Sequence, residues 1–267
     1  MTGGAPGPCD AGDGATPSPV GGPEGRPDLA SAAVSRTRAD ALRTVGRGTG
    51  QLLLTIGYVL LLFVVYELWV TDLQSNARQD ELTAELREEW TQPATVPAAL
   101  QGGEAFALLH IPRLGADYAR AIVEGTGPEE LAQGPGHYTG TAMPGELGNF
   151  AVAGHRVGRG SPFLEIDELR EGDPVVVETA AGWFVYRVLG PAEQVPGQQV
   201  VSPSDVSVIA PTPNGPADGP TTGAYLTLTT CHPEYSARER LVVHAVLDGA
   251  PLSRAEAPDG PPALLGA

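Results

Sequence analysis

Residues 52–66 form an uncharged and almost entirely apolar run. Extended past Glu67 to Val70, this run would form a helix about 28 Å long, which matches the hydrocarbon core of a bilayer. A signal-peptide core or a buried helix of a globular domain could also have this composition. A cleaved signal is disfavoured because the run lies about fifty residues into the chain and no small-x-small cleavage site ends it. We therefore predict a transmembrane helix over residues 51–70.

The charges on the two sides of this run differ in sign. Arginines precede it and carboxylates follow it: Arg36, Arg38, Arg43 and Arg47 before, and Glu67, Asp72, Asp80 and Glu81 after. Positive residues flanking a membrane helix favour the cytoplasmic side. We expect a single-pass protein of the cell membrane, with a cytoplasmic N-terminus and an extracytoplasmic main domain.

The rest of the chain divides by composition. Residues 1–50 are assigned to a disordered cytoplasmic segment, because residues 1–38 are rich in Gly, Pro, Ala and Asp and hold almost no large apolar side chain. Residues 71–103 are assigned to an extracytoplasmic stalk, helical over 71–90, followed by a linker that contains Pro93 and Pro97. Residues 104–249 form the folded domain, and residues 250–267 a disordered, Pro/Ala/Gly-rich tail.

Short alternating segments separated by Gly and Pro indicate an all-β domain. The predicted strands cover residues 105–111, 120–124, 149–154, 174–179, 183–189, 225–231 and 240–247, with helical turns over 129–133 and 162–170. About eight short strands favour a closed barrel over a sandwich, although the pattern alone does not separate the two.

Charge and cysteine content exclude some functions. The formal net charge is −16, from 32 acidic and 16 basic residues, which is the wrong sign for binding a nucleic-acid backbone. Cys9 and Cys231 are predicted on opposite sides of the membrane, so they cannot form a disulfide.

Two predicted strands flank a Pro-containing loop after Cys231. If residues 224–231 and 240–247 pair antiparallel across this loop, Cys231 lies opposite Arg240 with Cβ atoms about 5 Å apart. The opposite face then carries the apolar side chains that a core requires: Leu226, Leu228, Leu241, Val243 and Leu247.

A thiol beside a guanidinium suggests nucleophilic chemistry. The arginine stays charged and can favour a thiolate or hold an oxyanion. An unpaired extracytoplasmic thiol is at risk of oxidation, which also favours use of Cys231 as a nucleophile. The alternatives are a buried core cysteine and a solvated Arg240 at a strand end.

Acyl transfer by a cysteine also requires a proton donor for the leaving amine, usually a histidine. His155 ranks first because it ends a strand of small residues. His232 neighbours Cys231 and points away from it, and His244 lies about 13 Å along its strand. His110 and His137 lie in other segments, and any of these histidines could be structural. The spacing shows no metal-ligand pattern, so neither a metal nor a cofactor is expected.

Over about residues 104–247 the chain resembles the sortases, cysteine transpeptidases of the Gram-positive cell surface. The motifs are Thr-Leu-Thr-Thr-Cys at 227–231, Arg-Leu-Val-Val at 240–243 and Ala-Gly-His-Arg at 153–156. Further motifs resemble the actinobacterial class E branch: Ile-Pro-Arg-Leu at 111–114, Glu-Gly-Thr at 124–126, Gly-Pro-Gly-His-Tyr at 134–138 and Cys-His-Pro at 231–233.

This resemblance implies a closed eight-stranded sortase β-barrel and assigns roles to its residues. Cys231 is the implied nucleophile, His155 the implied proton donor, and Arg240 the implied oxyanion or substrate-orienting group. Tyr118 is associated with the choice of sorting signal, and Thr230 with a hydrogen bond to the acyl oxygen.

The resemblance also implies a substrate and partners. A class E enzyme would cleave a signal resembling Leu-Ala-x-Thr-Gly between Thr and Gly, through a thioacyl intermediate. Its partners would be surface proteins with C-terminal sorting signals and an amine of a lipid-linked peptidoglycan precursor. Residues 92–103 contain no aromatic-containing Asp-Pro lid, which favours housekeeping attachment to the cell wall over pilin polymerisation.

Two other functions are compatible with parts of the sequence. An L,D-transpeptidase is also a secreted cysteine acyltransferase, but its Ser-His-Gly-Cys pattern is absent around Cys231. A non-enzymatic, membrane-tethered β-domain that binds wall polymers or surface proteins would use Cys231, His155 and Arg240 only structurally.

Overall fold

The computed structural model describes residues 29–66, 71–91, 100–191 and 195–264. The chain divides into two compact units, residues 1–59 and 60–267. Two segments predicted to be disordered, residues 1–50 and 250–267, lie partly outside the described residues. Most of the predicted linker also lies outside them.

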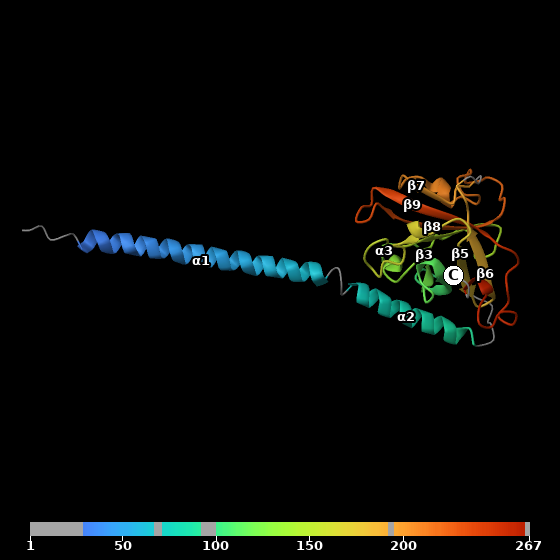
Figure 1. Cartoon of the computed structure of the whole chain (residues 1–267), viewed down its shortest axis with the longest axis horizontal. Helices are drawn as coiled ribbons and strands as arrows, with labels where there is room; N and C mark the ends of the chain where they lie inside the picture. Colours follow the sequence, from blue (N-terminus) through green and yellow to red (C-terminus); the bar gives the residue numbers. More distant parts are fainter. Residues whose placement is uncertain (1–28, 67–70, 92–99, 192–194, 265–267) are drawn as a thin grey trace, which may run out of the picture. The chain divides into compact units, whose positions relative to one another are not determined.

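Helix α1 spans Leu29–Val65 and contains residues 51–65 of the predicted membrane segment (Figure 1), whereas residues 67–70 of that segment lie outside the described residues. The segment Asp40–Val65 of this helix is long and apolar enough to cross a bilayer. Its mean hydropathy is 2.0, and none of its apolar side chains is buried against other parts of the protein. The prediction of a disordered segment up to residue 50 is wrong for residues 29–50, which are helical. This stretch has no proline, and its Ala, Leu and Arg residues favour a helix despite three glycines.

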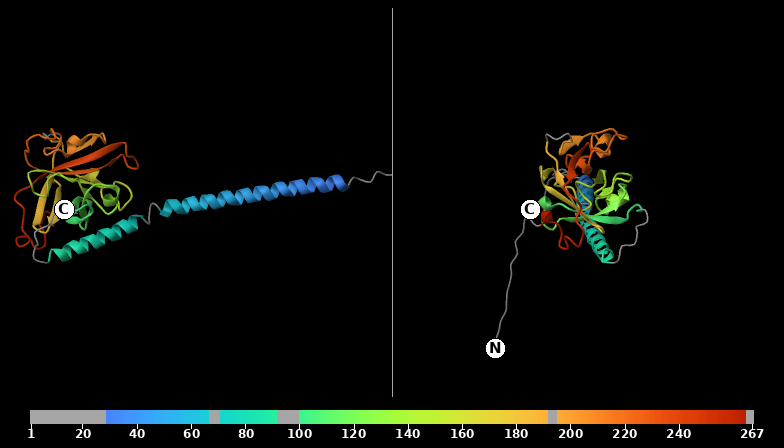
Figure 2. Two further views of the ribbon diagram at one scale, coloured as in Figure 1. Left: turned by 180° about the vertical axis from the view of Figure 1, so that it is seen from behind. Right: turned by 90° about the vertical axis from the view of Figure 1, so that its right-hand side faces the viewer.

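Over its described residues, the second unit contains nine strands and several short helical turns; Figure 2 shows it from two further sides. The strands are β1 Ala105–His110, β2 Ala119–Glu124, β3 Gly136–His137, β4 Gly148–Ala153, β5 Pro174–Thr179, β6 Gly182–Val188, β7 Gln198–Val201, β8 Ala224–His232 and β9 Glu239–Leu247. The turns are η2 Pro112–Leu114, α3 Pro128–Leu131, η3 Ile166–Glu168, η4 Val206–Ile209 and η5 Pro262–Leu264.

Eight of the strands close a barrel in the order β6-β5-β1-β2-β3-β4-β8-β9, because β9 pairs back to β6. This confirms the predicted closed eight-stranded barrel. Strand β7 is a ninth strand that pairs with the first half of β9. The sequence pattern did not predict β3 or β7, since β3 has only two residues and β7 is short and partly exposed.

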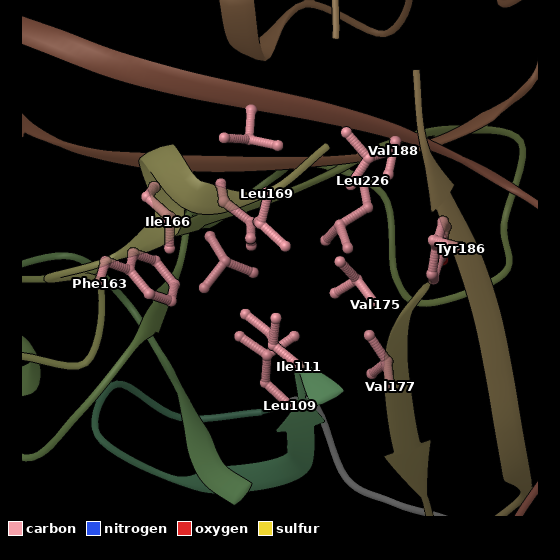
Figure 3. Packing of buried hydrophobic residues seen from close by; sticks show 14 of the residues in the cluster. Leu109, Ile111, Phe163, Ile166, Leu169, Val175, Val177, Tyr186, Val188 and Leu226 are labelled. Carbon is pink, nitrogen blue, oxygen red and sulfur yellow. The ribbon is translucent and has the colours of Figure 1, made fainter. Parts of the chain in front are cut away.

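The barrel encloses one large apolar core (Figure 3). Alternate residues of β8 and β9 point into it, including the predicted Leu226, Leu228, Leu241 and Val243. Each is almost fully buried, and burial of one such side chain contributes about 1.5–3 kcal/mol. The period-two pattern thus determines which face of the strand pair is left for chemistry.

Helix α2, Thr71–Glu89, has the predicted helical conformation but is not a free stalk. Leu82 and Leu86 are buried against Leu108 of β1 and residues 121 and 123 of β2. The Gln79 amide is also buried: its Oε1 accepts from Ala121 N at 2.7 Å, and its Nε2 donates to Ala121 O at 3.2 Å. The folded unit therefore begins with α2 rather than at Glu104.

The tail predicted to be disordered from residue 250 packs on the barrel over residues 250–264. Leu252 pairs with Trp183 of β6, and Trp183 Nε1 donates to Ala257 O at 2.9 Å. Arg254 donates to Glu178 and lies 4.5 Å from the ring centroid of Trp90. The composition did not predict this packing, because individual contacts of residues such as Leu252 and Arg254 attach the segment to the barrel. A periodic apolar stripe, which a sequence would reveal, is not needed.

Candidate active site

Cys231 and Arg240 are partners in the antiparallel pairing of β8 and β9. Both side chains are half-buried, and Cys231 is a free thiol. The predicted register is therefore confirmed. Directly opposed residues have Cβ atoms about 5 Å apart, so the guanidinium and the thiol share one face of the sheet.

The parallel pairing of β4 with β8 brings His155 beside Cys231. Ala153 is the partner of Thr229, and one residue further Gly154 N donates to Thr229 O at 3.0 Å. The alignment continues beyond the strand ends, where the residue after His155 contacts the residue after Cys231. Carried on by two positions, this register places His155 on the segment next to the strand that carries Cys231; neighbouring strands lie about 4.8 Å apart in the hydrogen-bonding direction.

The strand order β4-β8-β9 places the thiol in the middle of three groups. Cys231 has His155 on one side and Arg240 on the other, at the same end of the sheet. A nucleophile between an imidazole and a guanidinium can pass its proton to one neighbour while the other holds a developing negative charge. This arrangement suits acyl transfer.

The surroundings of His155 hold its backbone and keep it half-buried. Its carbonyl accepts from Phe163 N at 3.0 Å. A Cβ at position 154 would lie 2.5 Å from the Phe163 ring, so only glycine fits there. Burial lowers the pKa of His155, and the nearby charge of Arg159 lowers this pKa further. The imidazole is therefore mainly neutral at pH 7 and can accept the proton of the thiol.

Arg240 is held by the loop between β8 and β9. Its Nη1 donates to the carbonyl oxygens of Ala237 and Glu239, at 3.2 and 3.1 Å. A guanidinium carries five N–H groups in a fixed fork, so these two bonds leave others for a substrate oxygen.

Arg156 is a buried residue that the sequence indicated only as part of the Ala-Gly-His-Arg motif. It is 3% exposed, and its Nη2 lies 2.8 Å from Asp167 Oδ2 and 3.6 Å from Glu234 Oε1. Its Nη1 donates to His232 Nδ1 at 3.0 Å. A buried cation almost always has such partners. The arginine directly after the candidate histidine was therefore the sequence signal that could have identified this buried group.

The hydroxyl of Thr230 is engaged away from the thiol. Thr230 is buried and donates to Gly154 O at 2.8 Å. A hydroxyl has only one proton to donate, so this group does not also donate to an acyl oxygen in this structure. It instead joins β8 to the end of β4 directly before His155.

Two tyrosines near the candidate site, Tyr118 and Tyr138, have different hydrogen-bond partners. The hydroxyl of Tyr118 donates to Pro162 O at 2.6 Å, and burial raises the pKa of Tyr118 well above its usual value. The hydroxyl of Tyr138 lies 3.0 Å from Thr229 Oγ1. Thr229 is on the same face as Cys231, two residues before it, so Tyr138 borders the thiol face more directly than Tyr118. Pairing of the Gly-His-Tyr motif with residues 149–154 would have revealed this.

The other histidines with buried rings have structural partners. His137 Nδ1 lies 2.6 Å from Glu124, and its Nε2 lies 2.9 Å from Thr141 Oγ1. His110 lies 2.8 Å from Glu178, and His244 contacts Thr227 and Gln199 on the outer face of the barrel. In the part of the chain that the structure describes, no three His, Cys, Asp or Glu side chains are grouped to hold a metal ion.

Comparison with known proteins agrees with this geometry. The model of the sortase domain matches residues 109–248. Sortase SrtE1 of Streptomyces coelicolor is 41% identical over 205 residues, which are 74% of this chain and 55% of that protein, so the match spans about half of the relative's length. Sortase SrtE2 of the same organism is 34% identical over 206 residues, covering 73% of this chain and 78% of that protein.

A solved structure gives the same result for the fold. The SrtF sortase from Corynebacterium diphtheriae is 36% identical, with a TM-score of 0.60 over 66% of this chain and 100% of that chain.

Proposed function

The chain belongs to the sortase family of cysteine transpeptidases, in its class E branch, and we propose that it cleaves a Leu-Ala-x-Thr-Gly-like sorting signal between Thr and Gly. The observation that carries this proposal is the order β4-β8-β9, in which Cys231 lies between His155 and Arg240. Cys231 is the proposed nucleophile, His155 the acid–base group and Arg240 the oxyanion-binding group.

In the proposed first half-reaction, the Sγ of Cys231 attacks the carbonyl carbon of the signal's Thr. His155 accepts the thiol proton and delivers it to the Gly nitrogen as the C–N bond breaks. Arg240 stabilises the tetrahedral oxyanion, a contribution that grows as water is excluded from the site. The products are a thioester on Cys231 and a free Gly amine.

In the second half-reaction an acceptor amine attacks the thioester and the thiol is regenerated. We propose an amine of a lipid-linked peptidoglycan precursor as acceptor, and surface proteins with C-terminal sorting signals as donors. Helix α1 would hold the enzyme at the membrane where both meet. The arginines before the apolar run of this helix support a cytoplasmic N-terminus and an extracytoplasmic barrel.

Substrate contacts follow from the residues around the thiol face. Partly exposed Tyr138 lies beside Thr229, two residues before Cys231 on β8, so we place the signal residues before Thr next to Tyr138. Tyr118 supports the loop after His155 through Pro162, and Thr230 holds the end of β4 through Gly154. Both hydroxyls therefore support the position of His155, besides the substrate contacts expected of these two residues.

The test is mass spectrometry of the full chain in detergent, mixed with a Leu-Ala-x-Thr-Gly peptide. We expect an acyl adduct on Cys231 and release of the Gly-terminal fragment. The Cys231→Ala variant should give neither, and the Cys9→Ala variant is the matched control that should retain both. A parent chain that neither forms an adduct nor cleaves the peptide, or a cleaving Cys231→Ala variant, would refute the proposal.

A further inference from the structure

We propose that helix α2 is a positioning element of the active site, in which Asp72 holds the loop of residues 157–162 and thereby orients His155. The inference rests on the proposed function of His155. It concerns a helix residue that precedes Gly160 of that loop by 88 positions in the chain.

The contact between helix and loop is direct. Gly160 N donates to Asp72 Oδ1 at 2.9 Å, a hydrogen bond to a charged acceptor and therefore a strong one. A Cβ at position 160 would lie 3.2 Å from Asn76 Oδ1 and 3.4 Å from Ser75 Cβ. The loop backbone thus packs directly against the first two turns of α2.

This loop has a conformation that requires outside support. Four consecutive residues have positive φ: Gly158 at 75°, Arg159 at 56°, Gly160 at 77° and Ser161 at 43°. The left-handed region is unfavourable for a non-glycine residue such as Arg159 or Ser161, so such a run persists only where the surroundings stabilise it. The hydrogen bond from Gly160 N to the Asp72 carboxylate stabilises the middle of this run.

The other end of the loop is connected to His155. Tyr118 donates to Pro162 O at 2.6 Å, and Phe163 N donates to His155 O at 3.0 Å. Arg159, inside the loop, lies close enough to His155 to lower its pKa. A displacement of the loop would therefore change both the orientation and the electrostatic surroundings of the imidazole.

Helix α2 itself is firmly attached to the barrel, which makes it a suitable support. Ser75 Oγ donates to Ala132 O at 3.2 Å, and Gln79 Nε2 donates to Gln133 O at 2.6 Å. Together with buried Leu82 and Leu86, these contacts fix the helix independently of Asp72. Removing the Asp72 side chain should therefore release the loop and leave the helix in place.

The experiment compares three variants of the full chain in detergent. Asp72→Ala removes the acceptor, whereas Asp72→Asn removes the charge but keeps an Oδ1 that can accept from Gly160 N. Asp80→Ala removes a carboxylate from the exposed face of the same helix and is the matched control. The readouts are single-turnover acylation of Cys231 by the peptide, the peptide's KM, and hydrogen exchange of residues 157–162.

We expect Asp72→Ala to acylate about tenfold more slowly with little change in KM, because misplacement of a catalytic group lowers the rate of the chemical step. Its loop amides should exchange faster, while Asp72→Asn and Asp80→Ala stay close to the parent. If Asp72→Ala does not fold, Asp72→Glu, which moves the acceptor by one methylene, takes its place.

Three outcomes would overturn the inference. Parental acylation by Asp72→Ala would show that the loop does not orient His155. An Asp72→Asn variant as slow as Asp72→Ala would assign the effect to the charge at the helix start and not to the tether. Unchanged loop exchange in a slow Asp72→Ala variant would exclude the loop as the route. Failure of the proposed function is distinct, because the parent would then form no adduct.

Discussion

Nη1 of Arg156 donates to Nδ1 of His232 at 3.0 Å and so joins the residue after His155 to the residue after Cys231. The same guanidinium is paired with Asp167 at 2.8 Å and is 3% exposed. The two chains that carry the proposed nucleophile and acid–base group are therefore cross-linked one residue beyond the site. This link explains how a pair of parallel strand ends stays aligned where the regular pairing stops.

Replacing Arg156 by Lys should loosen this cross-link, because an ammonium cannot bond Asp167 and His232 together as the planar fork does. We expect a loss of about 2 kcal/mol in the free energy of unfolding and an acylation rate lowered about tenfold. Thermal unfolding and single-turnover acylation measure these, with the exposed Arg170→Lys as control. Parental values for both would show that the cross-link is dispensable.

Replacing Arg240 by Lys should abolish most of the activity while the fold is kept. Arg240 lies opposite Cys231 and already uses Nη1 on two carbonyls. An ammonium has three donors and no fork, so it cannot hold these carbonyls and an oxyanion together. We expect kcat/KM for the peptide to fall about a hundredfold with an unchanged melting temperature. Near-parental kcat/KM would remove Arg240 from the mechanism.

Acid should weaken the fold through His244. Its Nδ1 lies 2.8 Å from Thr227 Oγ1 and its Nε2 lies 3.0 Å from Gln199 Nε2, an arrangement that suits a neutral ring with Nε2 accepting. Burial lowers the pKa of His244 to about 4, from 6.5. The unfolded chain therefore binds this proton first as the pH falls, and stability is lost between about pH 6.5 and 4.

This loss should reach about 3 kcal/mol, from the difference between the two pKa values. The measurement is the free energy of unfolding of parent and His244→Gln across this pH range. The variant should be less stable at pH 7, and its stability should depend less on pH than that of the parent. Identical pH slopes in the two proteins would exclude His244 as the titrating group.

Residues 250–264 should stabilise the barrel through Trp183. The Trp183→Phe variant keeps an aromatic ring but loses the bond from Nε1 to Ala257 O. A buried hydrogen bond contributes about 1 kcal/mol, so the melting temperature should fall by about 2–4 °C. Removal of residues 250–267 should cost more, because Val176 and Trp183 lose the apolar cover that Leu252 and Ala257 provide. A truncated chain as stable as the parent would mean that this packing contributes nothing.

Local patterns in the sequence determined several parts of this protein. The apolar run predicted the long apolar helix, and period-two alternation predicted seven of the strands and the core-facing side of β8 and β9. The register of Cys231 against Arg240 also followed, because two strands joined by a short loop have few ways to pair. These features depend on residues that are close together in the chain.

Tertiary structure alone decided the features that depend on distant pairing. His155 lies beside Cys231 because β4 and β8 pair in parallel, and no local pattern encodes the pairing of Ala153 with Thr229. The packing of α2 and of residues 250–264 depends on single buried anchors such as Gln79 and Trp183, whose partners lie in remote strands. Such single contacts leave no periodic pattern in the sequence, so they can be identified only from the folded barrel.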